Sequence, residues 1–189
     1  MYELEPYYNW EDYYRSSEDE LSPFYDVEEP SFEYTNQVYN YLIHPNWDHF
    51  GSRTLYLKVL FVNYEKNYAI IELIGEWNDA VENDIMNLKR EVIDSMISNG
   101  ISKFILICEN VMNFHADDYD YYKEWQEDIE EEAGYMVLVN MPEHCLEEMK
   151  NARLTKYFWV LQYDKWRTHQ PKHFYHYVND YINNTLGTA

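Results

Sequence analysis

Residues 68–79 read YAIIELIGEWND, and this stretch decides how the chain folds. Its apolar centre, residues 70–74, is rich in branched aliphatic side chains and is typical of a β-strand. Asn78 or Asp79 can cap a helix that follows at once, and Glu82, three residues beyond Asp79, completes an imperfect capping box. The stretch therefore predicts a strand that leads directly into a helix.

A second strand is expected immediately before this one. Apolar side chains alternate between residues 55 and 64, which places four of them on one face: Leu55, Leu57, Val59 and Phe61. Residues 63–67 are mostly polar and are typical of a hairpin loop. We therefore expect the first two strands to pair antiparallel.

The helix after Asp79 is expected to continue to Gly100, which stands where a helix-ending glycine belongs. Its apolar residues recur every three or four positions and form one stripe: Val81, Ile85, Leu88, Val92 and Met96. The next segment, residues 104–108, is apolar throughout, as in a strand that is covered on both faces.

The rest of the chain continues this alternation. Residues 117–132 predict a very acidic helix with a buried stripe at Tyr121, Trp125 and Ile129. The segments that follow predict a strand at 135–139, a short helix at 142–150, a strand at 156–162 and a helix at 171–186. The order β-β-α-β-α-β-α-β-α predicts an α/β fold with a mixed, mostly parallel sheet and helices.

This order and two short motifs resemble the STAS domain, the fold of anti-sigma-factor antagonists and of sulfate-transporter tails. Residues 70–79 are similar to that family's apolar strand, Gly-Glu, turn and helix, and residues 103–111, KFILICENV, are similar to its central strand. The resemblance covers residues 55–161, somewhat over half of the chain. The stretch from residues 39–45 through residues 77–79 also resembles a bacterial family, and this resemblance implies no activity.

The STAS resemblance implies a functional loop after the central strand, where the family carries a phosphorylated serine at the start of the next helix. Here that loop, residues 109–117, reads ENVMNFHAD, so Ala116 stands near the phosphoacceptor position and the serine is missing. Asp117 and Asp118 either imitate a phosphorylated state or are simply good helix-start residues. The candidate interaction loop comprises Glu109, Asn113, His115, Ala116, Asp117 and Asp118.

Composition divides the chain into three parts. We expect an acidic, tyrosine-rich N-terminal arm at residues 1–50, a STAS-like α/β domain at 51–163 and a C-terminal helical extension at 164–189. The first forty residues contain one basic side chain, Arg15, and few aliphatic ones. They are either a disordered tail or an arm whose aromatic side chains lie on the domain.

Some features of the arm can be predicted in more detail. Phe24–Tyr25 and Phe32–Tyr34 are its candidate anchors, and residues 39–43 are expected to form a turn of helix. The only basic stretch of the chain, residues 165–173, is expected to dock the acidic arm.

The charge balance narrows the range of functions. The chain has 35 acidic and 14 basic residues and a formal net charge of −21, which disfavours nucleic-acid binding. The first ten residues do not form a secretory signal, and no apolar run is long enough to span a membrane. Cys108 and Cys145 suit a reducing compartment, so a cytoplasmic location is expected.

The sequence contains no P-loop, no dinucleotide-binding glycine motif and no nucleophile elbow, so no cofactor is expected. Histidines 169, 173 and 176 are spaced as helical metal ligands could be, but Pro171 interrupts the first pair and no metal site is expected.

Three functions therefore stay open, and the sequence does not determine the oligomeric state. The leading prediction is a non-catalytic protein-interaction or regulatory module that lacks the phosphoacceptor serine and has a protein partner. The alternative is a domain that binds a small apolar ligand or lipid. The third is an enzyme that uses His115 with Glu109 or Asp117 as acid and base.

Overall fold

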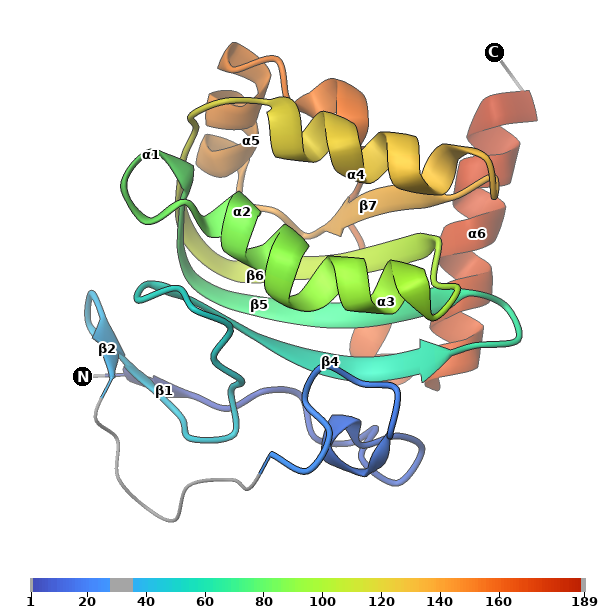
Figure 1. Ribbon diagram of the computed structural model, residues 1–189, viewed down its shortest axis with the longest axis horizontal. Coiled ribbons are helices and arrows are strands. Elements are labelled where there is room, and N and C mark those ends of the chain that lie inside the picture. The colour runs from blue at the N-terminus through green and yellow to red at the C-terminus, as the bar shows by residue number, and fades with distance from the viewer. Residues whose placement is uncertain (1, 28–35, 188–189) are drawn as a thin grey trace.

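The computed structural model describes residues 2–27 and 36–187 of the 189-residue chain. At its centre lies a five-stranded sheet in the order β4-β5-β6-β7-β8 (Figure 1). The strands are β4 (Leu55–Asn63), β5 (Tyr68–Asn78), β6 (Lys103–His115), β7 (Tyr135–Val139) and β8 (Trp159–Leu161). Because β4 pairs antiparallel with β5 and the other pairs are parallel, the predicted mixed α/β fold is confirmed.

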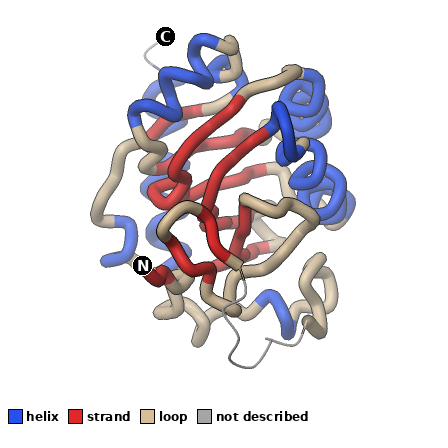
Figure 2. Tube along the Cα trace, turned by 90° about the vertical axis from the view of Figure 1, so that its left-hand side faces the viewer, coloured by secondary structure: helices blue, strands red, loops and turns tan. Residues whose placement is uncertain are grey.

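Helices cover both faces of this sheet (Figures 1 and 2). One face carries α1 (Asp79–Glu82), α2 (Asp84–Leu88), a π-helical turn (Lys89–Ile93), α3 (Asp94–Ser98), α4 (Asp120–Glu130) and α5 (Glu143–Asn151). The other face carries α6 (Pro171–Gly187) and part of the arm. No helix within the described ranges is long and apolar enough to cross a membrane.

A β-bulge in β4 moves Phe61 to the opposite face from its predicted neighbours. The pairing register shifts between Val59 and Phe61, so Leu60 is an extra residue. Phe61 therefore joins the core beneath α6, whereas the other three predicted residues join the core beneath α2 and α4. The prediction of one shared face is wrong for Phe61, because an alternating pattern does not reveal an inserted residue.

The helix predicted after Asp79 is broken near its start. Asn78 caps α1, as predicted, by accepting a hydrogen bond from the Val81 N–H at 3.0 Å. Asn83 then takes a left-handed conformation with φ 54° and separates α1 from α2. As a result Val81 is 69% exposed, and the predicted apolar stripe begins one turn later.

Helix α4 begins three residues later than predicted, at Asp120. Asp117 and Asp118 therefore precede the helix instead of opening it. Tyr122 rather than Tyr121 is the fully buried tyrosine of its apolar stripe. A run of aspartates and tyrosines gives the sequence no sharp signal for the first residue of this helix.

The arm forms a small second sheet in the order β1-β3-β2, from β1 (Tyr2–Leu4), β2 (Gln37–Val38) and β3 (Tyr41–Ile43). The turn of helix predicted at residues 39–43 is therefore wrong. Tyr39, with φ 52°, instead turns the chain between β2 and β3. Short apolar runs of this kind do not distinguish a strand from a helix.

Aromatic side chains hold the arm against the domain. Trp10 is 2% exposed, packs edge-on against Trp166 and donates from Nε1 to the carbonyl of His169 at 2.9 Å. Phe24 is also buried, whereas the candidate anchor Phe32–Tyr34 lies outside the described residues. The division of the chain at residues 50/51 and 163/164 stays a prediction.

The basic stretch meets the arm, but within residues 2–27 and 36–50 it makes no ion pair with an arm acid of the kind that the docking prediction assumed. The hydroxyl of Tyr7 donates to the backbone carbonyl of Arg167 at 2.8 Å, and the Arg167 guanidinium lies 5.8 Å from the centre of the Tyr7 ring. The ion pair of Arg167 is with Glu109 of β6. Rings and carbonyls therefore make this contact.

Candidate functional site

Strand β6 is 13 residues long and has neighbours of different lengths. Its pairing with β7 ends where Ile107 lies opposite Val139. Its second half continues beside β5 as far as His115, across two irregularities in register. On the side where β7 pairs with the first half of β6, the residues from Glu109 onward have no neighbouring strand and border an open surface.

A groove lies on this open surface, at the carboxyl ends of the parallel strands. One part, about 520 Å³ in volume, lies between β6, the β2–β3 hairpin and the start of α5, and its lining includes Tyr39, Tyr41, Glu109, Asn113 and His144. A second part, about 530 Å³, also touches Glu109 and adds Asn140, Glu143, Gln162 and Asp164. We call the two parts together the carboxyl-end groove. Open α/β sheets bind their ligands at this end.

Glu109 stands where the two parts of the groove meet. Its Oε1 forms an ion pair with Arg167, and its Oε2 lies 3.3 Å from Nε1 of Trp166 and 3.4 Å from Nδ2 of Asn140. These donors hold the Glu109 carboxylate in one place, in the lining that the two parts of the groove share.

His115 pairs with Glu76, not with the predicted carboxylates. Its Nε2 lies 2.9 Å from Oε1 of Glu76, and the other oxygen of Glu76 accepts from the Tyr39 hydroxyl at 3.0 Å. Asn113 Nδ2 lies 3.2 Å from the same His115 nitrogen. This network ties the arm to the ends of β5 and β6, and His115 itself does not line the carboxyl-end groove.

The six candidate residues do not form a single loop. Glu109, Asn113 and His115 lie in β6, and only Ala116, Asp117 and Asp118 belong to the connection before α4. Ala116 is half-buried against the core, and Asp118 Oδ1 accepts from the Tyr119 N–H at 2.6 Å. The first-turn acid of α4 is Asp120, which the sequence interpretation did not select. The placement of Ala116 at a phosphoacceptor position stays a prediction.

Solved structures of anti-sigma factor antagonists are similar to this chain in fold. The unphosphorylated form of SpoIIAA is 15% identical, with 55% of this chain and 86% of that chain covered and a TM-score of 0.44. A putative anti-sigma factor antagonist from Thermotoga maritima is 14% identical, with 58% and 86% covered and a TM-score of 0.43. The phosphorylated form of SpoIIAA from Bacillus is 15% identical, with 55% and 89% covered and a TM-score of 0.40.

The similarity spans somewhat more than half of the chain, as the STAS resemblance predicts, and it concerns the fold alone. No family model matches the sequence, and no curated protein matches it.

The sequence interpretation assigned no role at a site to three buried carboxyl groups, namely Asp84, which is 0% exposed, and the two described next. Glu72, 1% exposed, lies in β5 beneath the arm and accepts a hydrogen bond from the Tyr7 N–H at 2.8 Å. Asp79, also 1% exposed, accepts from Trp77 Nε1, the Ile85 N–H and the Tyr122 hydroxyl. For Glu72 the sequence does hold a signal, because it is the one charged residue in an otherwise apolar strand centre.

Burial raises the pKa of both Glu72 and Asp79 to about 7. For Glu72 the hydrogen bond from Tyr7 and the charge of Arg167 oppose this rise, while Glu109 adds to it. For Asp79 its three hydrogen bonds oppose the rise and Asp84 adds to it. Both carboxyl groups therefore change protonation near neutral pH instead of near pH 4.

We expect Glu72 to make the fold less stable as pH rises from about 5 to about 8. The folded state holds the Glu72 proton up to its raised pKa, whereas the unfolded chain has already lost it, so deprotonation favours unfolding. Urea unfolding of wild type and Glu72→Gln at pH 5 and pH 8 measures this. The loss of stability between the two pH values should be about 2–3 kcal/mol smaller in Glu72→Gln. Equal losses in both proteins would show that the Glu72 carboxyl is not perturbed.

A cluster of three carboxylates on α3 and α4 is already occupied by a cation of the protein itself. Oxygens of Asp94, Glu124 and Asp128 lie close enough together to hold a metal ion. The Nζ of Lys89 lies among them, 2.7 Å from Asp128 and 3.5 Å from Glu124, and it also contacts Asp94. Burial alone would lower the pKa of Lys89, but its hydrogen bonds to Asp128 and Asp94 outweigh burial and raise it. The cluster therefore serves the packing of α4 on the first helices.

Proposed function

We propose that this chain is a non-catalytic protein-interaction module that binds a basic segment of a partner protein in its carboxyl-end groove. The observation that carries the proposal is the groove itself, which offers the exposed acids Glu143 and Asp164 in one part and Tyr39 and Tyr41 in the other. Tyrosine supplies rigid, amphipathic contact area, and protein interfaces are enriched in it. The net charge of −21 adds a long-range attraction for basic partners.

The arrangement of His115 supports binding over acid–base chemistry. An enzyme of the predicted kind would need His115 next to Glu109 or Asp117, in a place that a substrate can reach. His115 instead pairs with Glu76 outside the groove, and Glu109 is held by Arg167. Each group thus has a structural contact that explains its position.

The groove can be tested with charge-matched variants. In Glu143→Lys with Asp164→Lys, two groove acids become cations, and partner binding should weaken at least about tenfold because attraction becomes repulsion. Glu131→Lys with Glu132→Lys makes the same change in charge at exposed positions beyond α4 and should bind nearly as wild type. Proteins captured from lysate by all three chains are compared by quantitative mass spectrometry, and a groove-dependent protein is then purified and titrated. Capture that falls equally in both variants would assign the effect to net charge and contradict the proposal.

The same experiment tests the loop acids. Asp117 and Asp118 are exposed and follow β6 at the groove end of the sheet. We propose that they contribute to the same partner surface and that binding is constitutive, because Ala116 offers no hydroxyl to phosphorylate. Asp117→Lys with Asp118→Lys should then weaken capture of the groove-dependent protein. Unchanged capture would remove these two residues from the proposed surface.

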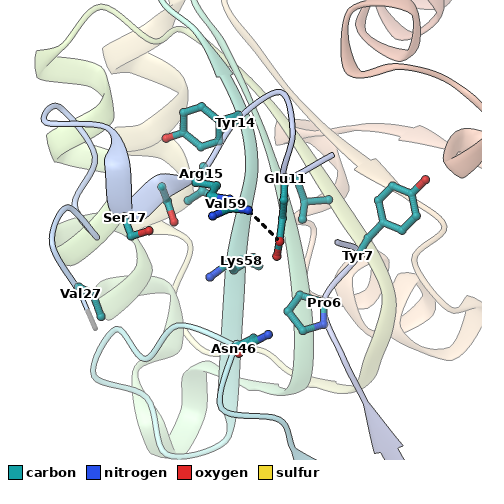
Figure 3. A pocket seen from close by; sticks show the side chains of 12 residues that line it. Pro6, Tyr7, Glu11, Tyr14, Arg15, Ser17, Val27, Asn46, Lys58 and Val59 are labelled. Carbon is teal, nitrogen blue, oxygen red and sulfur yellow. Dashed lines mark ion pairs between the residues drawn. The ribbon is translucent and has the colours of Figure 1, made fainter. Parts of the chain in front are cut away.

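The alternative of an apolar ligand is not supported by the pocket that the arm lines. A pocket between the arm and β4, about 370 Å³ in volume, is lined by Glu11, Arg15, Lys58 and two serines, as Figure 3 shows in part. Charged and hydroxyl groups of this kind suit a polar ligand and not a lipid chain.

A further inference from the structure

The pocket between the arm and β4 is lined by two basic side chains, which is unusual in so acidic a chain. We call it the arm pocket. Arm residues line it on more than one side, with Pro6 and Tyr7 across from Arg15, Ser17 and Val27, while Asn46 lies at one end and residues 58–60 of β4 form the floor (Figure 3). Of the charged side chains that line it among the described residues, Arg15 and Lys58 are bases and Glu11 is an acid, although the chain as a whole has 35 acids and 14 bases. Arg15 is moreover the only basic residue of the first forty.

Among the described lining residues, the acid Glu11 already brings a carboxylate to Arg15, whose Nη1 also lies 3.5 Å from Oε1 of Glu18. The Oε2 of Glu11 lies 3.9 Å from Nη2 of Arg15, and Figure 3 shows the carboxylate turned into the hollow. This contact is long, and both side chains are about half exposed, with relative exposures of 42% for Glu11 and 50% for Arg15. Ion pairs of this kind are weak, so another carboxylate can replace Glu11 at small cost.

The floor of the pocket adds backbone groups. Leu57 exchanges two backbone hydrogen bonds with Asp48, at 2.7 and 3.2 Å, and this bridge is isolated. Because backbone groups alternate along an antiparallel strand, the N–H and C=O of Val59 point to the same edge as those of Leu57. Val59 lines the arm pocket, so the edge of β4 presents hydrogen-bonding groups to it.

Hydroxyl and amide side chains complete the polar lining. Ser16 and Ser17 lie on the arm side of the pocket, and Asn46 lies at its end. Lys58 is largely buried, with 15% of its side chain exposed, and its Nζ lies 3.6 Å from the Asp48 carboxylate. A pocket of about 370 Å³ falls within the range of small-molecule sites.

We propose that the arm pocket binds a small organic carboxylate, which takes the place of the Glu11 carboxylate beside Arg15, with Lys58 in the lining of the same pocket. The planar guanidinium of Arg15 matches two carboxylate oxygens at once, which a spherical anion does not exploit. The serine hydroxyls, the Asn46 amide and the edge of β4 can bind the remaining polar atoms of the ligand. This site is separate from the carboxyl-end groove and does not depend on the function proposed for it.

Titration with succinate, at constant ionic strength and followed by amide chemical shifts of the full chain, tests the proposal. We expect shifts centred on Ser16, Ser17 and Asn46. Glu11→Gln removes the competing carboxylate of the pocket lining, while Glu18 stays in place, and should bind succinate several-fold more tightly. Arg15→Gln should bind at least about tenfold more weakly. Lys66→Gln, which removes an exposed base from the β4–β5 hairpin, should bind as wild type.

Tighter binding by Glu11→Gln is a gain, so it cannot result from misfolding of the variant. The proposal is overturned if neither wild type nor Glu11→Gln binds succinate, or if Arg15→Gln and Lys66→Gln weaken binding equally. It is also overturned if inorganic phosphate produces the shifts and succinate does not, because the site would then be selective for another class of anion.

Discussion

Gly75→Ala should destabilise the fold by about 4 kcal/mol or more, enough to unfold a domain of ordinary stability. Gly75 lies inside β5 with φ +115°, a conformation that other residues rarely adopt. An added Cβ would lie 2.0 Å from the carbonyl oxygen of Thr54, which is part of the backbone and cannot turn aside. The same carbonyl accepts a hydrogen bond from the Glu76 N–H at 2.8 Å, so moving it breaks a contact at the start of β4.

Gly100→Ala is the matched control for this effect. Gly100 also has a positive φ, +91°, but an added Cβ would meet no atom within 4 Å. Its cost is therefore the conformational one alone, about 1 kcal/mol. Urea unfolding of both variants separates strain in the backbone from steric overlap. If the two variants were equally stable, the approach of Thr54 would not be the reason for glycine at position 75.

Lys89→Met is expected to cost about 3 kcal/mol of stability. The side chain of Lys89 has no exposed surface, and methionine can fill a similar volume without the charge. The change leaves Asp94, Glu124 and Asp128 facing one another with no buried cation between them. These carboxylates are 35–39% exposed, so water relieves part of their repulsion and the effect falls at the lower end for a broken buried pair.

Arg90→Met provides the comparison, because Arg90 contacts two of the same acids. Its guanidinium lies 2.8 Å from Asp94 and 2.6 Å from Glu124, but its side chain is 44% exposed. Exposed pairs contribute about 0–1 kcal/mol, so this variant should be nearly as stable as wild type. Denaturant unfolding at low and high salt measures both variants. A Lys89→Met protein as stable as Arg90→Met would mean that burial adds nothing to the lysine's contribution.

Much of the α/β domain could be predicted because its strands carry continuous apolar runs and its first helix region ends at a glycine. Strand β7 lies where the sequence places it, at residues 135–139, and Gly100 has the positive φ that a helix end requires. The bulge at Leu60 and the break at Asn83 could not be predicted in this way. Both depend on one residue whose conformation is set by tertiary packing, and neither changes the average apolar period.

The site was harder to predict than the fold. The second half of β6 reads as a loop because its buried residues, Val111 and Phe114, are too widely spaced to suggest a strand. The pairing of His115 with Glu76 arises because parallel strands bring distant positions side by side, and Asn78 is the residue opposite His115. Nothing near His115 in the sequence identifies such a partner.

The contacts of the arm also bear on the order in which the chain is completed at the ribosome. Trp10 donates to a carbonyl 159 positions later in the sequence, and Tyr7 to one 160 positions later. A nascent chain therefore exposes these rings until residues 167–169 have been synthesised, and closing so long a loop is entropically unfavourable before the sheet has formed. We expect the arm to take its final place after the sheet has formed, although it is synthesised before the sheet.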